Sequence, residues 1–183
     1  MFKQNHLLKA LVPVVLSLSV ATAALGASTG ELDAAAAQTL KAFYSDNTTH
    51  QELAQKASGI LVFPRITKGG VGLGAEYGQG VLQVNGEPVA YFKIAGASVG
   101  ATLGVAGRSE IMLFMTPKAL EHFMNSNVWT VGVDADVAVV SKGAGGEYDT
   151  ETLQKPVLAF VFGEKGLIAD ISLAGTKITR KPS

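Results

Sequence analysis

The chain has 183 residues, and its 15 basic and 15 acidic side chains cancel to a formal net charge of zero. Without a net positive charge, no global field attracts nucleic acid, so we expect no nucleic-acid partner. The chain contains no cysteine, which excludes disulfides, thiol chemistry and acylation at a lipobox cysteine.

The first 27 residues have the features of an export signal. Lys3 and Lys9 form a basic start, residues 11–25 form an apolar run, and small residues offer cleavage sites between positions 23 and 27. The run is shorter than the roughly 20 apolar residues that a membrane-spanning helix needs. We therefore expect 1–27 to be a cleaved signal peptide. Residues 28–183 then form a single domain in an exported compartment, the bacterial periplasm, with 13 basic and 15 acidic side chains.

Two short helices are predicted at the start of this domain. Ser28 and Glu31 have the spacing of a capping box, and apolar residues recur at helical spacing up to Phe43, which predicts a helix over 31–44. A second capping pattern at Thr49 and Glu52 predicts another short helix, which ends by Gly59.

From Gly59 onward the hydrophobic period changes to two, which predicts strands over 60–63, 71–77 and 80–84, a hairpin turn at Asn85-Gly86 and a long strand over 89–105. We expect Pro64 to end the first strand. Between residues 68 and 80, glycine leaves one strand face almost bare. Because glycine costs roughly 0.5–1 kcal/mol in regular structure, something must approach this backbone closely. The spacing does not match a phosphate-binding loop.

Small residues between 96 and 104 form a second bare face, which predicts strands that curl as in a barrel or a strongly bent sheet. A strand over 111–115 follows, and Thr116-Pro117 begins a helix. Strands over 131–140, 157–162 and 167–173 complete the set. The predicted fold class is α+β, with a strongly curved, mostly antiparallel sheet or barrel-like core, two N-terminal helices and one inserted helix.

No catalytic constellation is present in the sequence, and we expect no enzyme activity, cofactor or metal. His50 and His122 have no partner pattern and are interpreted as packing or surface residues. Glu110 is either a buried base or an edge residue, and the edge is favoured because unpaired carboxylates are rarely buried. Asp134 and Asp136 fall on one face of a predicted strand, where they either hold Ca²⁺ or Mg²⁺ or face solvent.

Several motifs in the same order resemble the SYLF lipid-binding domain: residues 57–64 (ASGILVFP), 68–80 (KGGVGLGAEYGQG), 159–167 (AFVFGEKGL) and 175–180 (GTKITR). The resemblance covers residues 33–180. Eukaryotic members of this family bind phosphoinositide membranes, and some bind and bundle actin. The resemblance implies a lipid-binding module without catalysis. In an exported bacterial protein, an anionic phospholipid is the expected ligand and actin is not expected.

Basic residues at the expected turns and at the C-terminus are the candidate lipid-binding residues: Arg65, Lys68, Lys142, Lys165, Lys177 and Arg180. At roughly 1 kcal/mol each, four or five of them supply about 4–5 kcal/mol, which corresponds to sub-millimolar binding. Insertion of the N-terminal helix or a lipid pocket under the glycine faces is expected to supply the rest. The alternatives are that these cations form a solvated rim, and that the protein is a structural or protein-interaction component of the bacterial envelope.

Overall fold

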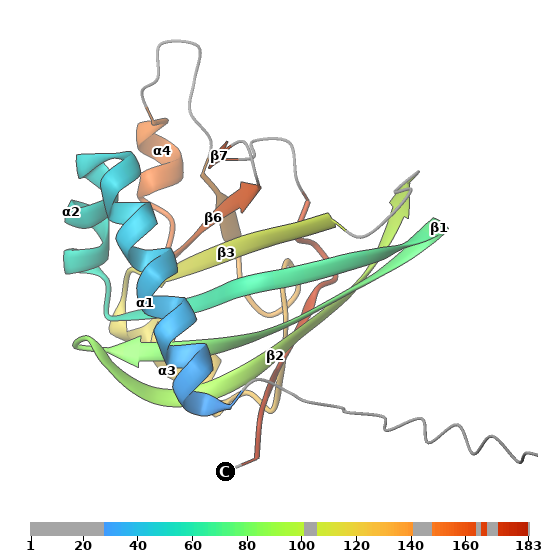
Figure 1. The fold of residues 1–183 in the computed structure, drawn as a ribbon. Coiled ribbons are helices and arrows are strands. Elements are labelled where there is room, and N and C mark those ends of the chain that lie inside the picture. The colour runs from blue at the N-terminus through green and yellow to red at the C-terminus, as the bar shows by residue number, and fades with distance from the viewer. Residues whose placement is uncertain (1–27, 101–105, 141–147, 164–165, 168–171, 183) are drawn as a thin grey trace, which may run out of the picture.

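The computed structural model describes residues 28–100, 106–140, 148–163, 166–167 and 172–182, with the backbone alone for 70–73, 98–100, 106 and 166–167. The described residues form a curled half-barrel sheet with helices on both faces (Figure 1). The helices are α1 (Thr29–Asp46), α2 (Thr48–Lys56), α3 (Pro117–Asn125) and α4 (Thr150–Leu153). The strands are β1 (Gly59–Val84), β2 (Glu87–Gly100), β3 (Ala106–Phe114), β4 (Val128–Thr130), β5 (Val137–Val139), β6 (Val157–Gly163), β7 (Gly166–Leu167) and β8 (Lys177–Arg180).

The order of strands across the sheet is β4-β8-β2-β1-β3-β6-β5, and β7 pairs with β6. Neighbouring strands are antiparallel except for β5 and β6, which are parallel. The predicted α+β class with a curved, mostly antiparallel sheet is confirmed.

Strand β1 doubles back on itself (Figure 1). Residues 59–68 pair with β3, and residues 72–84 pair with β2. The two arms lie side by side, as two glycines show. A methyl group on Gly78 would lie 2.9 Å from the Arg65 carbonyl oxygen, and one on Gly80 would lie 2.7 Å from the Val62 carbonyl oxygen. The close approach predicted for the glycine face is therefore confirmed at these two positions. Pro64 does not end the strand, because the register with β3 shifts between Phe63 and Ile66 and pairing resumes beyond this irregularity.

Each face of the sheet carries a buried core, although part of one face is exposed. On one face, which we call the α3 face, Phe123 of α3 packs with Phe63, Phe92, Phe114 and Trp129. On the other, the α1 face, residues of α1 and α2 pack on residues of β1, β3 and β6. Adjacent residues over 111–114 of β3 and 157–161 of β6 alternate between the two cores, and this explains why these two segments are continuous hydrophobic runs.

Helices α1, α2 and α3 begin where local signals predict, with small differences. The capping box of Ser28 and Glu31 is formed, and the Thr116 side chain caps α3. Helix α2 is capped by Asn47 rather than Thr49, since the Asn47 side chain accepts a hydrogen bond from the Thr49 amide. Asn85 and Gly86 have φ of 53° and 84°, as the predicted hairpin turn requires.

The predicted strand over 131–140 is wrong in its first half. After β4 the chain turns at Gly132, whose φ is 78°, and only Val137–Val139 form a strand. The short elements α4 and β8 have no counterpart among the predicted elements. Of the strand predicted over 167–173, Leu167 belongs to β7, residues 168–171 lie outside the described residues, and 172–173 are not in a strand.

Candidate functional site

Part of the α1 face is not covered by a helix. Helix α1 packs on β1, and its start is fixed over β2 by a hydrogen bond of 3.0 Å from the Tyr91 hydroxyl to Asp33. Beyond α1 the returning arm of β1, β2 and β8 continue side by side (Figure 1). Most of their residues on this face are exposed, including Tyr77 with 48% of its surface accessible, and Gln79 is half-buried.

Strand alternation decides which side chains reach this surface. Phe92 and Ile94 are buried on the α3 face, so Lys93 between them lies on the α1 face. Ile178 is likewise buried on the α3 face, so its neighbours Lys177 and Thr179 also lie on the α1 face. The register aligns Gln79, Lys93 and Thr179 in one row across the sheet and Tyr77, Ala95 and Lys177 in the next.

Four cations gather on this surface, which we call the basic face: Arg65, Lys93, Lys177 and Lys181. Lys181 is held by a hydrogen bond of 2.7 Å from its Nζ to Gln79 Oε1. Residues 75–79, 93–97 and 177–180 contain one acidic side chain, Glu76, and it lies on the α3 face. Neighbouring strands are about 4.8 Å apart, so the cations are close enough to act on one anionic surface.

The basic face also has an apolar part. Ala75, Ala95 and Ala97 are exposed beside Tyr77. A tyrosine ring among small side chains presents an apolar body and a polar tip, which is the residue type found where water meets an apolar phase.

The structure places the six predicted cations in different parts of the molecule. Arg65 and Lys177 belong to the basic face. Lys68 follows Ile66 by two residues, and Arg180 follows Ile178 by two, so both fall on the α3 face. Lys142 and Lys165 lie outside the described residues.

Two cations of the basic face, Lys93 and Lys181, are missing from the predicted set. Lys93 could have been predicted from its neighbours. It stands between two hydrophobic residues, Phe92 and Ile94, so strand alternation places its side chain on the opposite face. Lys181 depends on a long-range contact with Gln79 that no local pattern indicates.

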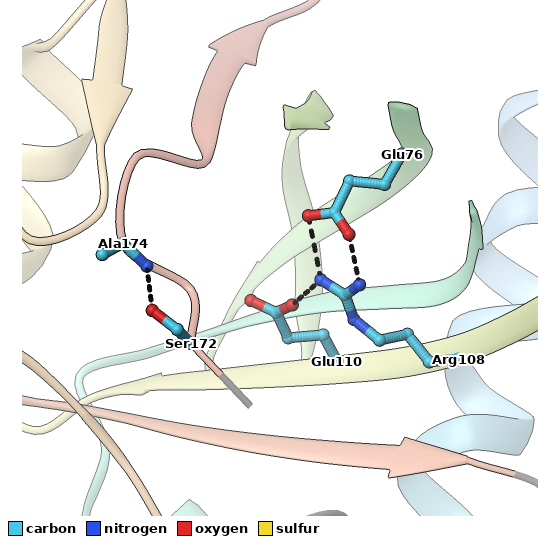
Figure 2. Close-up of polar contacts among 5 residues, drawn as sticks. All are labelled: Glu76, Arg108, Glu110, Ser172 and Ala174. Atoms are coloured by element: carbon cyan, nitrogen blue, oxygen red, sulfur yellow. Dashed lines mark hydrogen bonds and ion pairs between the residues drawn. The ribbon is translucent and has the colours of Figure 1, made fainter. Parts of the chain in front are cut away.

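A second polar cluster is buried on the α3 face (Figure 2). The Arg108 guanidinium donates to Glu76 at 2.5 and 3.2 Å and to Glu110 Oε2 at 3.4 Å. Gly96 makes room for this pairing, because a methyl group there would lie 2.8 Å from Glu76 Oε1. Glu110 Oε1 and Arg108 Nε are buried and have no hydrogen-bond partner among the described residues.

Glu110 is fully buried, so the expected edge position is wrong. Arg108, two residues earlier on the same strand face, supplies the charge partner that a buried carboxylate needs. Burial raises the pKa of Glu110 to about 7, although the Arg108 charge and hydrogen bond act in the opposite direction. Glu76 also belongs to this cluster, as a buried ion pair with Arg108.

The other candidate residues have structural roles. His50 is buried, with Nδ1 2.8 Å from the Phe43 carbonyl oxygen and Nε2 hydrogen-bonded to the Tyr148 hydroxyl. His122 is exposed on α3.

Asp134 and Asp136 do not share a strand face, because Asp134 lies in the turn after β4. Asp134 accepts a hydrogen bond from the Thr130 amide at 2.6 Å, and Asp136 pairs with Lys155 at 3.0 Å. The described part of the chain contains no group of three or more His, Asp and Glu side chains that could hold a metal ion.

None of the helices in the described residues has the length and apolar character to cross a membrane. A search of curated proteins found no match to the chain. The family model of Ysc84, described as Las17-binding protein actin regulator, matches residues 95–183. This segment runs from β2 to the C-terminus and contains the motifs at 159–167 and 175–180, whereas the motifs at 57–64 and 68–80 precede it. Residues 95–183 therefore belong to the Ysc84 (SYLF) domain family, as the sequence motifs predicted.

Proposed function

We propose that this protein is a non-catalytic lipid-binding module of the bacterial periplasm that binds anionic phospholipid headgroups at a membrane surface through the basic face. The observation that carries the proposal is the gathering of Arg65, Lys93, Lys177 and Lys181 on one uncovered sheet surface. The membership of residues 95–183 in the Ysc84 (SYLF) family supports it. The family description names actin regulation, but we do not propose actin as the partner of an exported protein.

Electrostatic attraction supplies part of the binding free energy. At roughly 1 kcal/mol per cation near an anionic membrane, four cations contribute about 4 kcal/mol, which corresponds to a dissociation constant on the order of 1 mM. An apolar contribution is therefore needed for tighter binding.

The two apolar sources expected from the sequence do not fit the structure. The apolar side of α1 is already buried, since Leu32, Ala36 and Phe43 are at most 5% exposed. The space beside Gly78 and Gly80 is occupied by Ile66 and Phe63, so it holds no lipid pocket. Exposed Tyr77, among the alanines of the basic face, is the side chain placed to enter the interfacial layer of the bilayer.

Vesicle co-sedimentation tests the proposal. Vesicles of phosphatidylcholine alone are compared with vesicles that also contain cardiolipin or phosphatidylglycerol, at low and at high salt. We expect recovery with the anionic vesicles at low salt and its loss at high salt, because salt screens exposed charges. Equal recovery with neutral and anionic vesicles at low salt would contradict the proposal. A stoichiometric protein partner recovered from an envelope extract, without lipid, would favour the protein-interaction alternative.

Location is a separate part of the proposal. Fractionation of cells that express the full chain should recover a shortened protein in the periplasmic fraction, with its new N-terminus between residues 24 and 28 if cleavage follows the predicted sites. Recovery of the uncut chain in the cytoplasm would refute export.

A further inference from the structure

Two adjoining hollows lie between α1 and the sheet. The larger has a volume of about 550 Å³ and the smaller about 370 Å³. Both are lined by Ala35 of α1 and by Pro64 and Arg65 of β1, so they meet at these residues. The larger volume lies within the roughly 300–1,000 Å³ that is typical of small-molecule sites.

The hollows follow from small side chains on one flank of α1. Ala35 and Ala42 line the larger hollow, and larger side chains at these positions would fill part of it. On the sheet side, the irregularity at Pro64 interrupts the pairing with β3. The floor of the larger hollow is formed by Phe43 and Phe162, whose rings lie edge to face at 5.8 Å. The space therefore has an apolar floor.

The charges around the hollows favour an anion at one position. Arg65 lies where the two hollows meet, and no carboxylate of the described residues forms an ion pair with it. The acidic residues at the far ends already have contacts: Glu31 accepts from the Ser28 amide at 2.9 Å, and Asp46 lies 3.8 Å from His50 Nδ1. An anionic group at Arg65 would therefore pair with a cation that no carboxylate in the described part of the chain engages. An acyl chain attached to that group would lie next to the apolar floor of the hollow.

The smaller hollow connects this space to the basic face. Tyr77 and Gln79 line it together with Arg65, and they belong to the two adjacent rows of residues that cross β1, β2 and β8. A molecule held at the basic face by its headgroup is therefore adjacent to the opening.

From these contacts we infer that the space under α1 takes one acyl chain of an anionic phospholipid, whose headgroup lies at Arg65 on the edge of the basic face. This inference rests on the proposed function and goes beyond it. The protein then withdraws a chain from the bilayer surface instead of only resting on the headgroups. The chain then adds an apolar contribution to the binding free energy. This contribution comes from the space between α1 and the sheet, so α1 stays packed on the sheet.

The test uses a monomeric single-chain probe, 1-myristoyl lysophosphatidylglycerol, below its micelle-forming concentration. The zwitterionic lysophosphatidylcholine of the same chain length and glycerol 3-phosphate are the comparison ligands. Titration calorimetry on the full chain should show the tightest binding for lysophosphatidylglycerol and at least tenfold weaker binding for each of the others. Equal affinity for lysophosphatidylglycerol and glycerol 3-phosphate would overturn the inference, because the chain would then contribute nothing.

Filling the space gives the matched variant. Ala35→Leu with Ala42→Leu places larger side chains into the hollow and keeps good helix formers in α1. Ala34→Leu with Ala37→Leu makes the same change at exposed positions that do not line it. The filled variant should lose at least tenfold in affinity for lysophosphatidylglycerol while the control keeps the wild-type value. Wild-type affinity in a folded filled variant would overturn the inference.

A second measurement does not depend on the folding of a variant. Amide and side-chain NMR shifts of the wild-type protein should change at residues 35–43 and at Phe162 with lysophosphatidylglycerol, but not with glycerol 3-phosphate. Changes confined to Tyr77 and Lys93 would show surface binding alone and overturn the inference.

The same samples separate this inference from the proposed function. If the filled variant loses the lysolipid but still sediments with anionic vesicles, both stand as separate properties. If the wild type binds the lysolipid in the hollow but does not prefer anionic vesicles, the chain site stands and the membrane function fails.

Discussion

At the scale of single residues, the buried carboxyl group of Glu110 is the feature with the clearest consequence for stability. It is fully buried, it shares Arg108 with Glu76, and one of its oxygens has no hydrogen-bond partner among the described residues. Two carboxylates on one guanidinium leave a net negative charge in the core whenever both are ionised. Burial therefore favours the neutral form of Glu110 and raises its pKa to about 7.

This pKa predicts how stability depends on pH. In the unfolded chain the carboxyl group has its ordinary pKa of 4.5 and loses its proton there, whereas the folded chain retains the proton up to about 7. The folded state therefore binds more protons between these values, and the contribution of Glu110 to the free energy of unfolding decreases as pH rises from about 4.5 to 7. The decrease is on the order of 3 kcal/mol, at about 1.4 kcal/mol per pKa unit.

Urea unfolding at pH 5 and pH 8 measures the effect. Glu110→Gln keeps the shape and removes the titration, so this variant should lose much less stability between the two pH values than the wild type does. Glu121→Gln on exposed α3 is the control and should behave like the wild type. An unchanged decrease in Glu110→Gln would show that Glu110 is not responsible.

The close packing of Gly80 against the first arm of β1 leads to a second prediction for a single residue. A methyl group there would lie 2.5 Å from the Phe63 ring and 2.7 Å from the Val62 carbonyl oxygen, which is backbone and cannot rotate away. Gly80→Ala should lower the free energy of unfolding by about 1–3 kcal/mol. Gly69→Ala, in the same strand with nothing within 4 Å of the added carbon, should be neutral or slightly stabilising. Thermal unfolding of both variants checks this, and equal stability would contradict the packing of the two arms of β1.

At the scale of elements, His50 connects the start of α2 to a distant segment. Its ring stacks on Phe43 with centroids 4.2 Å apart, and it is hydrogen-bonded to the hydroxyl of Tyr148, just before α4. Tyr148→Phe removes this hydrogen bond and should cost about 1 kcal/mol in the free energy of unfolding. Tyr77→Phe, at an exposed position, is the control and should cost little. A negligible loss in Tyr148→Phe, measured by urea unfolding, would mean that the contact does not hold the helices in place.

The elements that could be predicted are those with local signals. Capping residues mark α1 and α3, and Asn85-Gly86 marks the turn between β1 and β2. The return of β1 past Pro64 and the pairing of β8 with β2 depend on residues far apart in the chain, and no local pattern encodes them. The buried pair of Arg108 and Glu76 joins residues 32 positions apart, so its burial could not be read from either strand alone.

The sequence predicts a basic candidate site but not which of its cations lie on one surface. Basic residues near chain turns indicated an anionic ligand, and Arg65 and Lys177 do lie on one surface. Lys68 and Arg180 fall on the opposite face because a shift of one residue in a strand reverses the side to which a side chain points. Assigning them required the burial of Ile66 and Ile178, which only the assembled sheet reveals.

At the scale of the whole molecule, the two faces of the sheet differ in how far they are covered. The α3 face is filled by Phe123, Trp129 and their neighbours. The α1 face is covered by helices at one end and leaves the basic face exposed at the other (Figure 1). We therefore expect charge on the α1 face to control membrane binding and the same charge on the α3 face to have little effect.

The most direct test compares two charge-reversal variants in vesicle co-sedimentation. Lys93→Glu with Lys177→Glu changes the basic face, and Lys118→Glu with Arg180→Glu makes the same change in net charge at exposed positions outside it. With phosphatidylglycerol vesicles at low salt, the first variant should lose at least tenfold in binding and the second should keep most of it. Equal loss in both variants would show that only net charge matters, and wild-type binding by the first variant would contradict the assignment of the basic face.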